Sequence, residues 1–320
     1  MRLLSGGFLF FVFAALAATA PSAFAQEDLL SLDELRVPGL NEYAPPRQND
    51  PLALAETGEV TLSALLSEES EEIPGGLVWR IFAPEPGADG TLPLVATAKG
   101  GTSTFMLPPG GYLVHAAYGR AGATKRITVG PEPKTEQLVL DAGGLKLDAV
   151  LPGGIRIPPQ RLRFSIYESE PDATGERPLI IPDVQPDSVV RLNAGTYHVV
   201  STYGSVNAVI RADIRVEAGE LTEATVEHRA APVTLKLVRE PGGEAIADTA
   251  WSILAGTGEM VREMVGAYAS MVLAEGEYTV VAKNRDRIYR RDFTVVPGRR
   301  QDVELLPDDL VDPDEEIITD

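Results

Sequence analysis

Three histidines, His115, His198 and His228, are the side chains of this sequence best suited to acid–base catalysis near neutral pH. A hydrolase would also need an activated nucleophile beside such a base, but the chain has no cysteine and no Gly-x-Ser-x-Gly turn. Each histidine falls in a stretch that alternates as a β-strand does, and none recurs at the same place in the internal repeats described below. We therefore expect ordinary strand residues, no catalytic site and a protein that is not an enzyme.

Carboxylates that could bind a cation gather near the C-terminus. They are Asp308, Asp309, Asp312, Asp314, Glu315 and Glu316. Their spacing is not that of an EF-hand loop and lacks its turn glycine, so we expect a solvated tail, with calcium binding as the alternative. Clustered His and Cys ligands for another metal are absent from the sequence. Residues 256–258 read Gly-Thr-Gly without the third glycine of a nucleotide loop, which predicts a hairpin turn and no cofactor.

Arginines are concentrated near the end of the chain, where they could bind an anionic partner. They are Arg285, Arg287, Arg290, Arg291, Arg299 and Arg300. Guanidinium groups suit lipid head groups, anionic glycans or an acidic protein. The alternative is an ordinary exposed face, on which these arginines pair with Asp286, Asp292, Asp302 and Glu304.

The elements that carry these residues are written three times. A Gly-x-Tyr motif occurs at residues 110–112, 195–197 and 276–278, at intervals of about 80 residues. An aromatic-x-Ile motif precedes each copy, at residues 79–81, 164–166 and 251–253, and an alternating strand precedes that, around Leu62, Leu147 and Leu235. Two-residue alternation and frequent turn signals predict about seven short strands in each copy. The sequence thus predicts an all-β protein of three tandem seven-stranded immunoglobulin-like antiparallel sandwiches.

The repeated aromatic residues have a structural interpretation. Glycine permits a turn before the strand, and a tyrosine two residues later can bond back to the turn backbone, as in a tyrosine corner. A simpler alternative is that the tyrosine only fills the end of the sandwich. In either case we expect structural anchors at Trp79, Phe164, Trp251, Tyr112, Tyr197 and Tyr278.

The ends of the chain differ from its repeats. Residues 1–25 resemble a signal peptide, with Arg2, an apolar run from Phe8 to Ala18 and a small-x-small cleavage site before Gln26. We predict a disordered, acidic, Pro-containing linker at 26–58, sandwiches at 59–142, 143–230 and 231–306, and a disordered acidic tail at 307–320. The joins are expected to be short, at residues 142–144 and 230–232. The net charge of −19 disfavours nucleic acid as a partner.

The motif at residues 107–114, Leu-Pro-Pro-Gly-Gly-Tyr-Leu-Val, resembles exported bacterial β-sandwich repeats of the carboxypeptidase-regulatory-like and transthyretin-like type. Residues 192–199 and 273–280 are similar, so the resemblance extends over all three repeats. It implies modules that act as spacers, adhesive stalks or accessory domains.

These observations predict a non-catalytic scaffold or interaction protein of the bacterial envelope, exported to the periplasm or cell surface and not transmembrane after signal cleavage. Its partners would be an envelope protein, or a glycan or anionic lipid head groups. One alternative is a carbohydrate-binding module array, for which Tyr118, Tyr203 and Tyr289 are the candidate aromatic residues. Another is an accessory subunit of an envelope enzyme.

Overall fold

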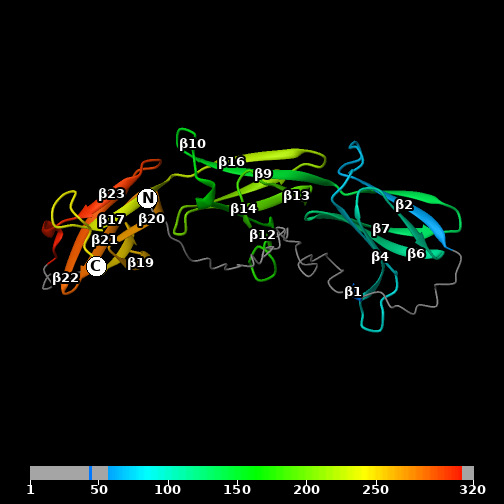
Figure 1. Ribbon diagram of the computed structural model, residues 1–320, viewed down its shortest axis with the longest axis horizontal. Helices are drawn as coiled ribbons and strands as arrows, with labels where there is room; N and C mark the ends of the chain where they lie inside the picture. Colours follow the sequence, from blue (N-terminus) through cyan, green and yellow to red (C-terminus); the bar gives the residue numbers. More distant parts are fainter. Residues whose placement is uncertain (1–42, 45–56, 312–320) are drawn as a thin grey trace, which may run out of the picture. The chain divides into compact units, whose positions relative to one another are not determined.

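A computed structural model describes residues 43–44 and 57–311, all within one compact unit, Glu42–Asp320 (Figure 1). The predicted signal peptide, nearly all of the predicted linker and residues 312–320 of the predicted tail lie outside the described residues. The helices in the described ranges are two short 3₁₀ turns, η3 (Pro159–Arg161) and η4 (Pro307–Asp309), and neither approaches the length or apolar character of a membrane span.

The described strands form three sandwiches, which Figure 1 colours in turn from blue to red. The first contains β2 (Gly58–Leu65), β3 (Leu77–Phe82), β4 (Leu92–Gly100), β5 (Ser103–Leu107), β6 (Gly110–Tyr118), β7 (Ala121–Val129) and β8 (Lys134–Val139). The second contains β9 (Ala142–Leu151), β10 (Ile155–Arg156), β11 (Leu162–Glu168), β12 (Leu179–Val184), β13 (Val189–Asn193), β14 (Gly195–Tyr203), β15 (Val209–Val216) and β16 (Leu221–Glu227). The third contains β17 (Ala230–Leu237), β18 (Thr249–Ala255), β19 (Met260–Gly266), β20 (Tyr268–Ala274), β21 (Gly276–Asn284), β22 (Arg287–Val295) and β23 (Gln301–Leu305).

The three sandwiches share one topology. A four-stranded sheet has the order β4-β3-β6-β7 in the first, β12-β11-β14-β15 in the second and β19-β18-β21-β22 in the third. Facing it, the opening strand lies between the fourth and the last strand of the sandwich, as in β5-β2-β8 and β20-β17-β23. The all-β sandwich prediction is confirmed. One detail differs, because the opening strand pairs in parallel with the last strand in every sandwich.

Each sandwich has its own core. In β9, buried residues alternate with partly exposed ones, as expected where a strand turns one face to the interior. Separate clusters of buried side chains form around Trp79, Phe164 and Trp251. The indole Nε1–H of Trp79 donates to Gly101 O at 2.8 Å, and that of Trp251 donates to Gly266 O at 3.0 Å. These bonds satisfy the polar atom of a large buried side chain.

Three boundary predictions are corrected. The expected joins at 142–144 and 230–232 lie inside β9 and β17, so only residues 140–141 and 228–229 stand between consecutive sandwiches. Within the predicted linker, β1 (Tyr43–Ala44) pairs in parallel with β4. Within the predicted tail, η4 is followed by a bridge from Leu310 to Tyr289, and Val311 N donates to Ile288 O at 2.8 Å. The start of the disordered tail was therefore predicted too early in the sequence, at residue 307.

Candidate interaction surface

The three histidines have structural surroundings. His115 lies on β6 and its Nδ1 is 3.0 Å from Thr124 Oγ1, and His198 lies on β14 with its Nδ1 2.7 Å from Asp213 Oδ1. His228 was expected on a strand but lies in the two-residue connection before β17, where its Nε2 is 2.8 Å from Ser201 Oγ. No second histidine or acid completes a catalytic arrangement around His228 among the contacts of the described residues.

Burial determines the protonation of two of these histidines. It lowers the pKa of His228 from 6.5 to about 4, because a charged imidazole would lose its hydration. It also lowers the pKa of His115 to about 4, with a smaller effect of the Arg80 guanidinium in the same direction. Both rings are therefore neutral at neutral pH, and each is held by a hydroxyl group.

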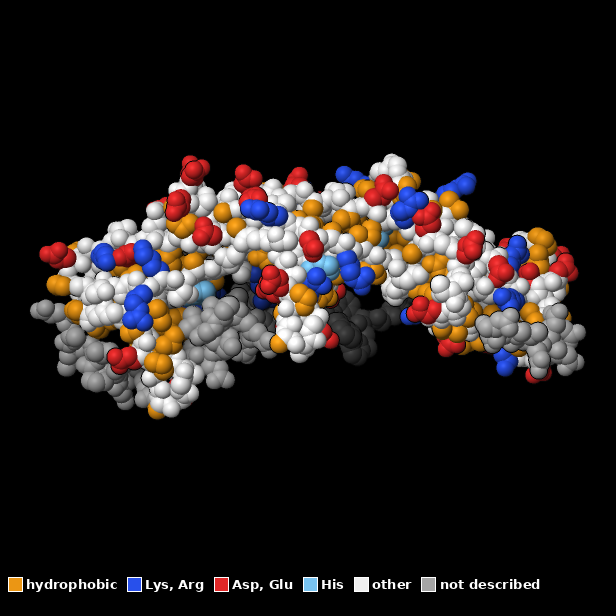
Figure 2. Space-filling model, turned by 180° about the vertical axis from the view of Figure 1, so that it is seen from behind, with side chains coloured by type: hydrophobic (Ala, Val, Ile, Leu, Met, Phe, Trp, Pro, Cys, Tyr) orange, Lys and Arg blue, Asp and Glu red, His pale blue; other side chains and the backbone are white. Residues whose placement is uncertain are grey.

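The six arginines do not form one patch. Arg285 lies in the turn before β22, whereas Arg299 and Arg300 follow its other end. A strand of nine residues is about 30 Å long, which separates the two groups. Arg290 and Arg291 are consecutive on β22 and so point to opposite faces. Figure 2 shows acidic and basic side chains interspersed over the face in view.

The contacts of Arg291 also differ from the ion pairs expected from the sequence. Arg291 donates to the backbone oxygen of Glu304 at 2.6 Å and lies 3.6 Å from Asp309 Oδ2. The expected acidic partners contact other groups: Asp292 accepts from Thr279, Asp302 pairs with Lys236 and the Glu304 carboxylate accepts from Gly242 N. Asp309 accepts in addition from Leu306 N, which fixes η4. No group of three potential metal ligands occurs in the described part of the chain, and Asp312, Asp314, Glu315 and Glu316 lie beyond it.

The anchor tyrosines have the same hydrogen bond in all three sandwiches. The hydroxyl of Tyr112 donates to Pro108 O at 2.8 Å, that of Tyr197 to Asn193 O at 2.8 Å and that of Tyr278 to Ala274 O at 2.9 Å. Each acceptor lies four residues before its tyrosine, as in the tyrosine-corner interpretation. Burial and the Glu168 carboxylate raise the pKa of Tyr197 to about 12, so its hydroxyl remains a donor.

The aromatic residues of the carbohydrate hypothesis are mainly packing residues. Tyr203 is 2% exposed and Tyr289 is 8% exposed, so neither offers a ring face to a sugar. Tyr118 is half-buried against the first core, and its ring is covered by the Arg191 guanidinium at 4.3 Å. The structure thus gives the carbohydrate hypothesis no platform built from these three residues.

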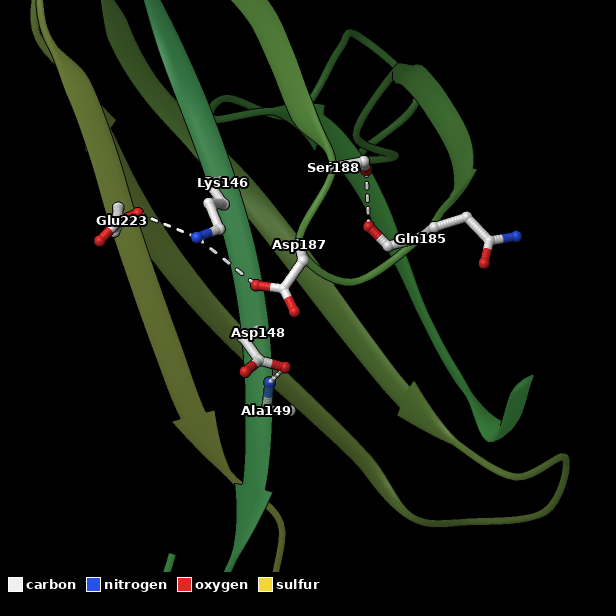
Figure 3. A network of polar contacts seen from close by, with 7 residues as sticks. All are labelled: Lys146, Asp148, Ala149, Gln185, Asp187, Ser188 and Glu223. Atoms are coloured by element: carbon white, nitrogen blue, oxygen red, sulfur yellow. Dashed lines mark hydrogen bonds and ion pairs between the residues drawn. The ribbon is translucent and has the colours of Figure 1, made fainter. Parts of the chain in front are cut away.

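The polar contacts on the exposed sheet face of the second sandwich are ordinary surface ion pairs and local hydrogen bonds. Figure 3 shows Lys146 of β9 between Glu223 of β16, at 3.0 Å, and Asp187, at 3.5 Å. Nearby, Asp148 accepts from Ala149 N and Ser188 donates to Gln185 O. The lysine bridges a strand and a turn, and such exposed ion pairs contribute little to stability.

A more specific arrangement lies at the junction of the first and second sandwiches. The β6–β7 hairpin of the first meets the end of β13 in the second, and Arg120 N donates to Arg191 O at 3.0 Å. The side-chain amide of Asn193 donates to Gly122 O at 3.1 Å and to Leu140 O at 2.7 Å, and accepts from Gly122 N at 3.2 Å. Three backbone groups of the hairpin, Arg120 N, Gly122 N and Gly122 O, are thereby hydrogen-bonded to the next sandwich.

The junction of the second and third sandwiches joins the corresponding elements. The β14–β15 hairpin of the second meets the end of β20 in the third, where Val272 is 4% exposed and packs into the core of the second sandwich. Asn207 of the hairpin accepts from Ala274 N at 3.0 Å and donates to the Tyr278 hydroxyl at 2.8 Å. At both junctions the hairpin of one sandwich therefore docks on the strand that precedes the anchor-tyrosine strand of the next, which is β13 at the first junction and β20 at the second.

Sequence reasoning missed this docking surface. A signal was available, because Gly119 and Gly204 occupy the same place after their anchor tyrosines and adopt positive φ angles of 66° and 79°. Positive φ alone explains glycine in a hairpin turn. That the glycine also faces a neighbouring sandwich depends on the tertiary structure.

Comparison with known proteins gives a family match for one sandwich. A model described as the Rhizobiales growth-associated tandem repeat domain matches residues 232–307, which comprise the third sandwich. No curated protein matches this chain. The family match supports the resemblance to bacterial tandem repeats; it does not specify the carboxypeptidase-regulatory-like or transthyretin-like type.

Several solved structures are similar in part. They include the minor pilin GBS52 of Streptococcus agalactiae, at 17% identity, a TM-score of 0.32 and coverage of 53% of this chain and 95% of that one. A streptococcal ancillary pilin matches at 11% identity and a TM-score of 0.28, with coverage of 78% and 99%. The Bacillus anthracis TIE protein matches at 18% identity and a TM-score of 0.24, and the chain spans 50% of its length. Likeness at this level supports no conclusion about activity or partners.

Proposed function

We propose that this chain is an exported, non-catalytic scaffold or interaction protein of the bacterial envelope. The observation that carries the proposal is the repeated docking of a hairpin of one sandwich on β13 or β20 of the next. Contacts of this kind hold neighbouring modules in register and leave their outer loops and edge strands for other molecules.

The surroundings of the histidines support a role without catalysis. His115 and His228 are buried, have hydroxyl partners and carry lowered pKa values. A general base must reach a proton of its substrate, which a buried ring engaged within a sandwich does not. The side chains best suited to acid–base chemistry thus stabilise the fold.

Export is proposed from the sequence of residues 1–25. The description of the matched family as growth-associated supports a role in the growth of the bacterial cell, and the tandem repeat named in it supports a scaffold. We keep a transthyretin-like module type, and an envelope protein, glycan or lipid head group as partner, within this proposal.

Fractionation of the source bacterium tests export. The full chain with a C-terminal tag should appear in the periplasmic or surface fraction, with an N-terminus at Gln26 by mass spectrometry. A matched variant without residues 2–25 should remain in the cytoplasm. Recovery of the wild-type chain from the cytoplasm with residues 1–25 intact would overturn the proposal.

Crosslinking in intact cells tests the scaffold role. Wild-type protein should crosslink reproducibly to defined envelope components, and a variant with one junction opened, Val272→Asp, should lose part of that pattern at equal abundance. A wild-type pattern no different from that of an unrelated exported sandwich protein would contradict a scaffold function.

A further inference from the structure

Two positions recur at every sandwich end and make the junction contacts. The first lies six residues before the anchor tyrosine and is Met106, Arg191 or Val272 in the three sandwiches. The second lies seven residues after it and is Gly119, Gly204 or Arg285. At each junction, the second position of one sandwich, here termed the docking position, faces the first position of the next, here termed the receiving position.

Close approach at these positions requires glycine. A Cβ atom built on Gly119 would lie 3.0 Å from the Cβ of Arg191, and one built on Gly204 would lie 2.7 Å from the Cβ of Val272. Real Cβ atoms essentially never lie closer to a neighbour than about 3 Å, because van der Waals repulsion rises steeply there. The hairpin tip at Gly204 therefore has no room for a side chain, and at Gly119 a side chain would fit only if Arg191 moved by a few tenths of an ångström.

In the first sandwich, no hairpin among the described residues covers the receiving position, Met106. Met106 lies on β5 opposite Glu59 of β2 and is 59% exposed, whereas its counterpart Val272 is 4% exposed beneath a hairpin. Met106 thus presents a long, adaptable apolar side chain at the place where Val272 of the third sandwich is covered. Its neighbour Leu107 is buried like Leu192 and Leu273, so the strand end has the same orientation in all three sandwiches.

The third sandwich carries the docking position without glycine. Arg285 has a φ of 55°, the left-handed conformation that Gly119 and Gly204 adopt at 66° and 79°. Since the backbone conformation is retained, its Cβ would approach a receiving residue as closely as the Cβ atoms built on those glycines. The third hairpin has the shape for docking and a side chain that prevents it.

We propose that the Met106 surface of the first sandwich binds the glycine-tipped β-hairpin of a partner sandwich of the same kind, and that Arg285 keeps a second copy of this chain from occupying it. The occupant is inferred from continuity with the two internal junctions, which bind such a hairpin at the equivalent position. A heterologous contact of this type would otherwise propagate from copy to copy into open chains. The inference concerns the purified chain and does not depend on export.

Arg285→Gly in the mature full-length chain supplies the required hairpin and serves as the probe. By sedimentation velocity over a hundredfold range of concentration, wild-type protein should remain monomeric, and the variant should at least double its weight-average mass. Folding is not endangered, because glycine accepts a positive φ more readily than arginine does. Circular dichroism verifies this.

Two further variants make the test specific. Arg285→Gly combined with Met106→Asp should return to the monomer, and Arg287→Gly, which removes an exposed arginine of the same hairpin outside the docking position, should behave as wild type. The proposal is overturned if Arg285→Gly stays monomeric, if wild-type protein associates equally, or if Met106→Asp leaves the association unchanged.

Discussion

At the first junction, Leu140 and Ala116 lie where His228 and Ser201 lie at the second, and both pairs are buried. The leucine and alanine belong to the hydrophobic cluster of the first sandwich. The histidine and serine form a hydrogen bond of 2.8 Å, and the histidine ring meets the edge of Tyr203 at a centroid distance of 5.9 Å. The same backbone positions thus accept either an apolar or a polar pair.

The asparagine amides also come from opposite sides of the two junctions. Asn193 belongs to the following sandwich and reaches back to Gly122 and Leu140, whereas Asn207 belongs to the preceding sandwich and reaches forward to Ala274 and Tyr278. Docking geometry is therefore shared through the backbone, and the side chains that stabilise it differ. This difference can be tested by substitutions at matched positions.

The largest expected effect is that of Val272→Asp. A carboxylate would be buried in the core of the second sandwich without a partner, which costs about 3–5 kcal/mol. Arg191→Asp at the matched position of the first junction removes only an exposed cation–π contact and should cost about 1 kcal/mol. Urea unfolding followed by circular dichroism measures both. Equal costs would show that the junctions do not differ in burial.

The next effect is the pH dependence of stability that His228 adds at the second junction. The pKa of His228 is lowered to about 4 in the folded chain from an ordinary 6.5, so the unfolded state binds its proton first as the pH falls. The contribution of His228 to stability is complete above about pH 6.5 and is lost progressively toward pH 4, about 3 kcal/mol in all. Unfolding free energies at neutral pH and near pH 4.5 measure the loss.

A matched double variant isolates the histidine. Ser201→Ala with His228→Leu copies the pair of the first junction and leaves no hydroxyl unpaired. It should lose less stability on acidification than wild type, while His115 continues to contribute its own part. An unchanged pH profile would remove His228 as the cause.

The sequence predicted what local pattern determines. Alternation predicted the strands, and the repeated Gly-x-Tyr predicted anchors such as Tyr112, because both the turn and the acceptor lie within four residues of the ring. Parallel pairing of β2 with β8 could not be predicted in this way, because alternation does not show which distant strand is a neighbour. The arginines near β22 are close in sequence but separated by the length and the two faces of a strand.

The junctions were beyond sequence reasoning for the same physical reason. Asn193 contacts Gly122 and Leu140 across a long separation in sequence, and neither partner carries a motif. An asparagine at the end of a strand, directly before a turn, is compatible with turn formation alone. Only the docking of two folded sandwiches makes it a bridging group.

Asn193→Ala should have an intermediate effect. It leaves Gly122 N and two carbonyl oxygens without their partners at a half-buried site, which costs about 2 kcal/mol. Asn207→Ala removes fewer bonds to the backbone and should cost about 1 kcal/mol. Thermal unfolding of the two variants gives the ranking, and a larger cost for Asn207→Ala would reverse the comparison.

The smallest effects are expected from the anchor hydroxyls, where the second junction adds one bond. Tyr112→Phe and Tyr197→Phe each lose one hydrogen bond and should cost about 1 kcal/mol. Tyr278→Phe also loses the bond from Asn207 and should cost slightly more.

A double-mutant cycle of Asn207→Ala with Tyr278→Phe should show a coupling of about 0.5–1 kcal/mol. The cycle of Asn207→Ala with Tyr112→Phe should be additive, since the bond of the Tyr112 hydroxyl found among the described residues is to Pro108 within its own sandwich. Additivity in both cycles would mean that the anchor of the third sandwich does not take part in docking.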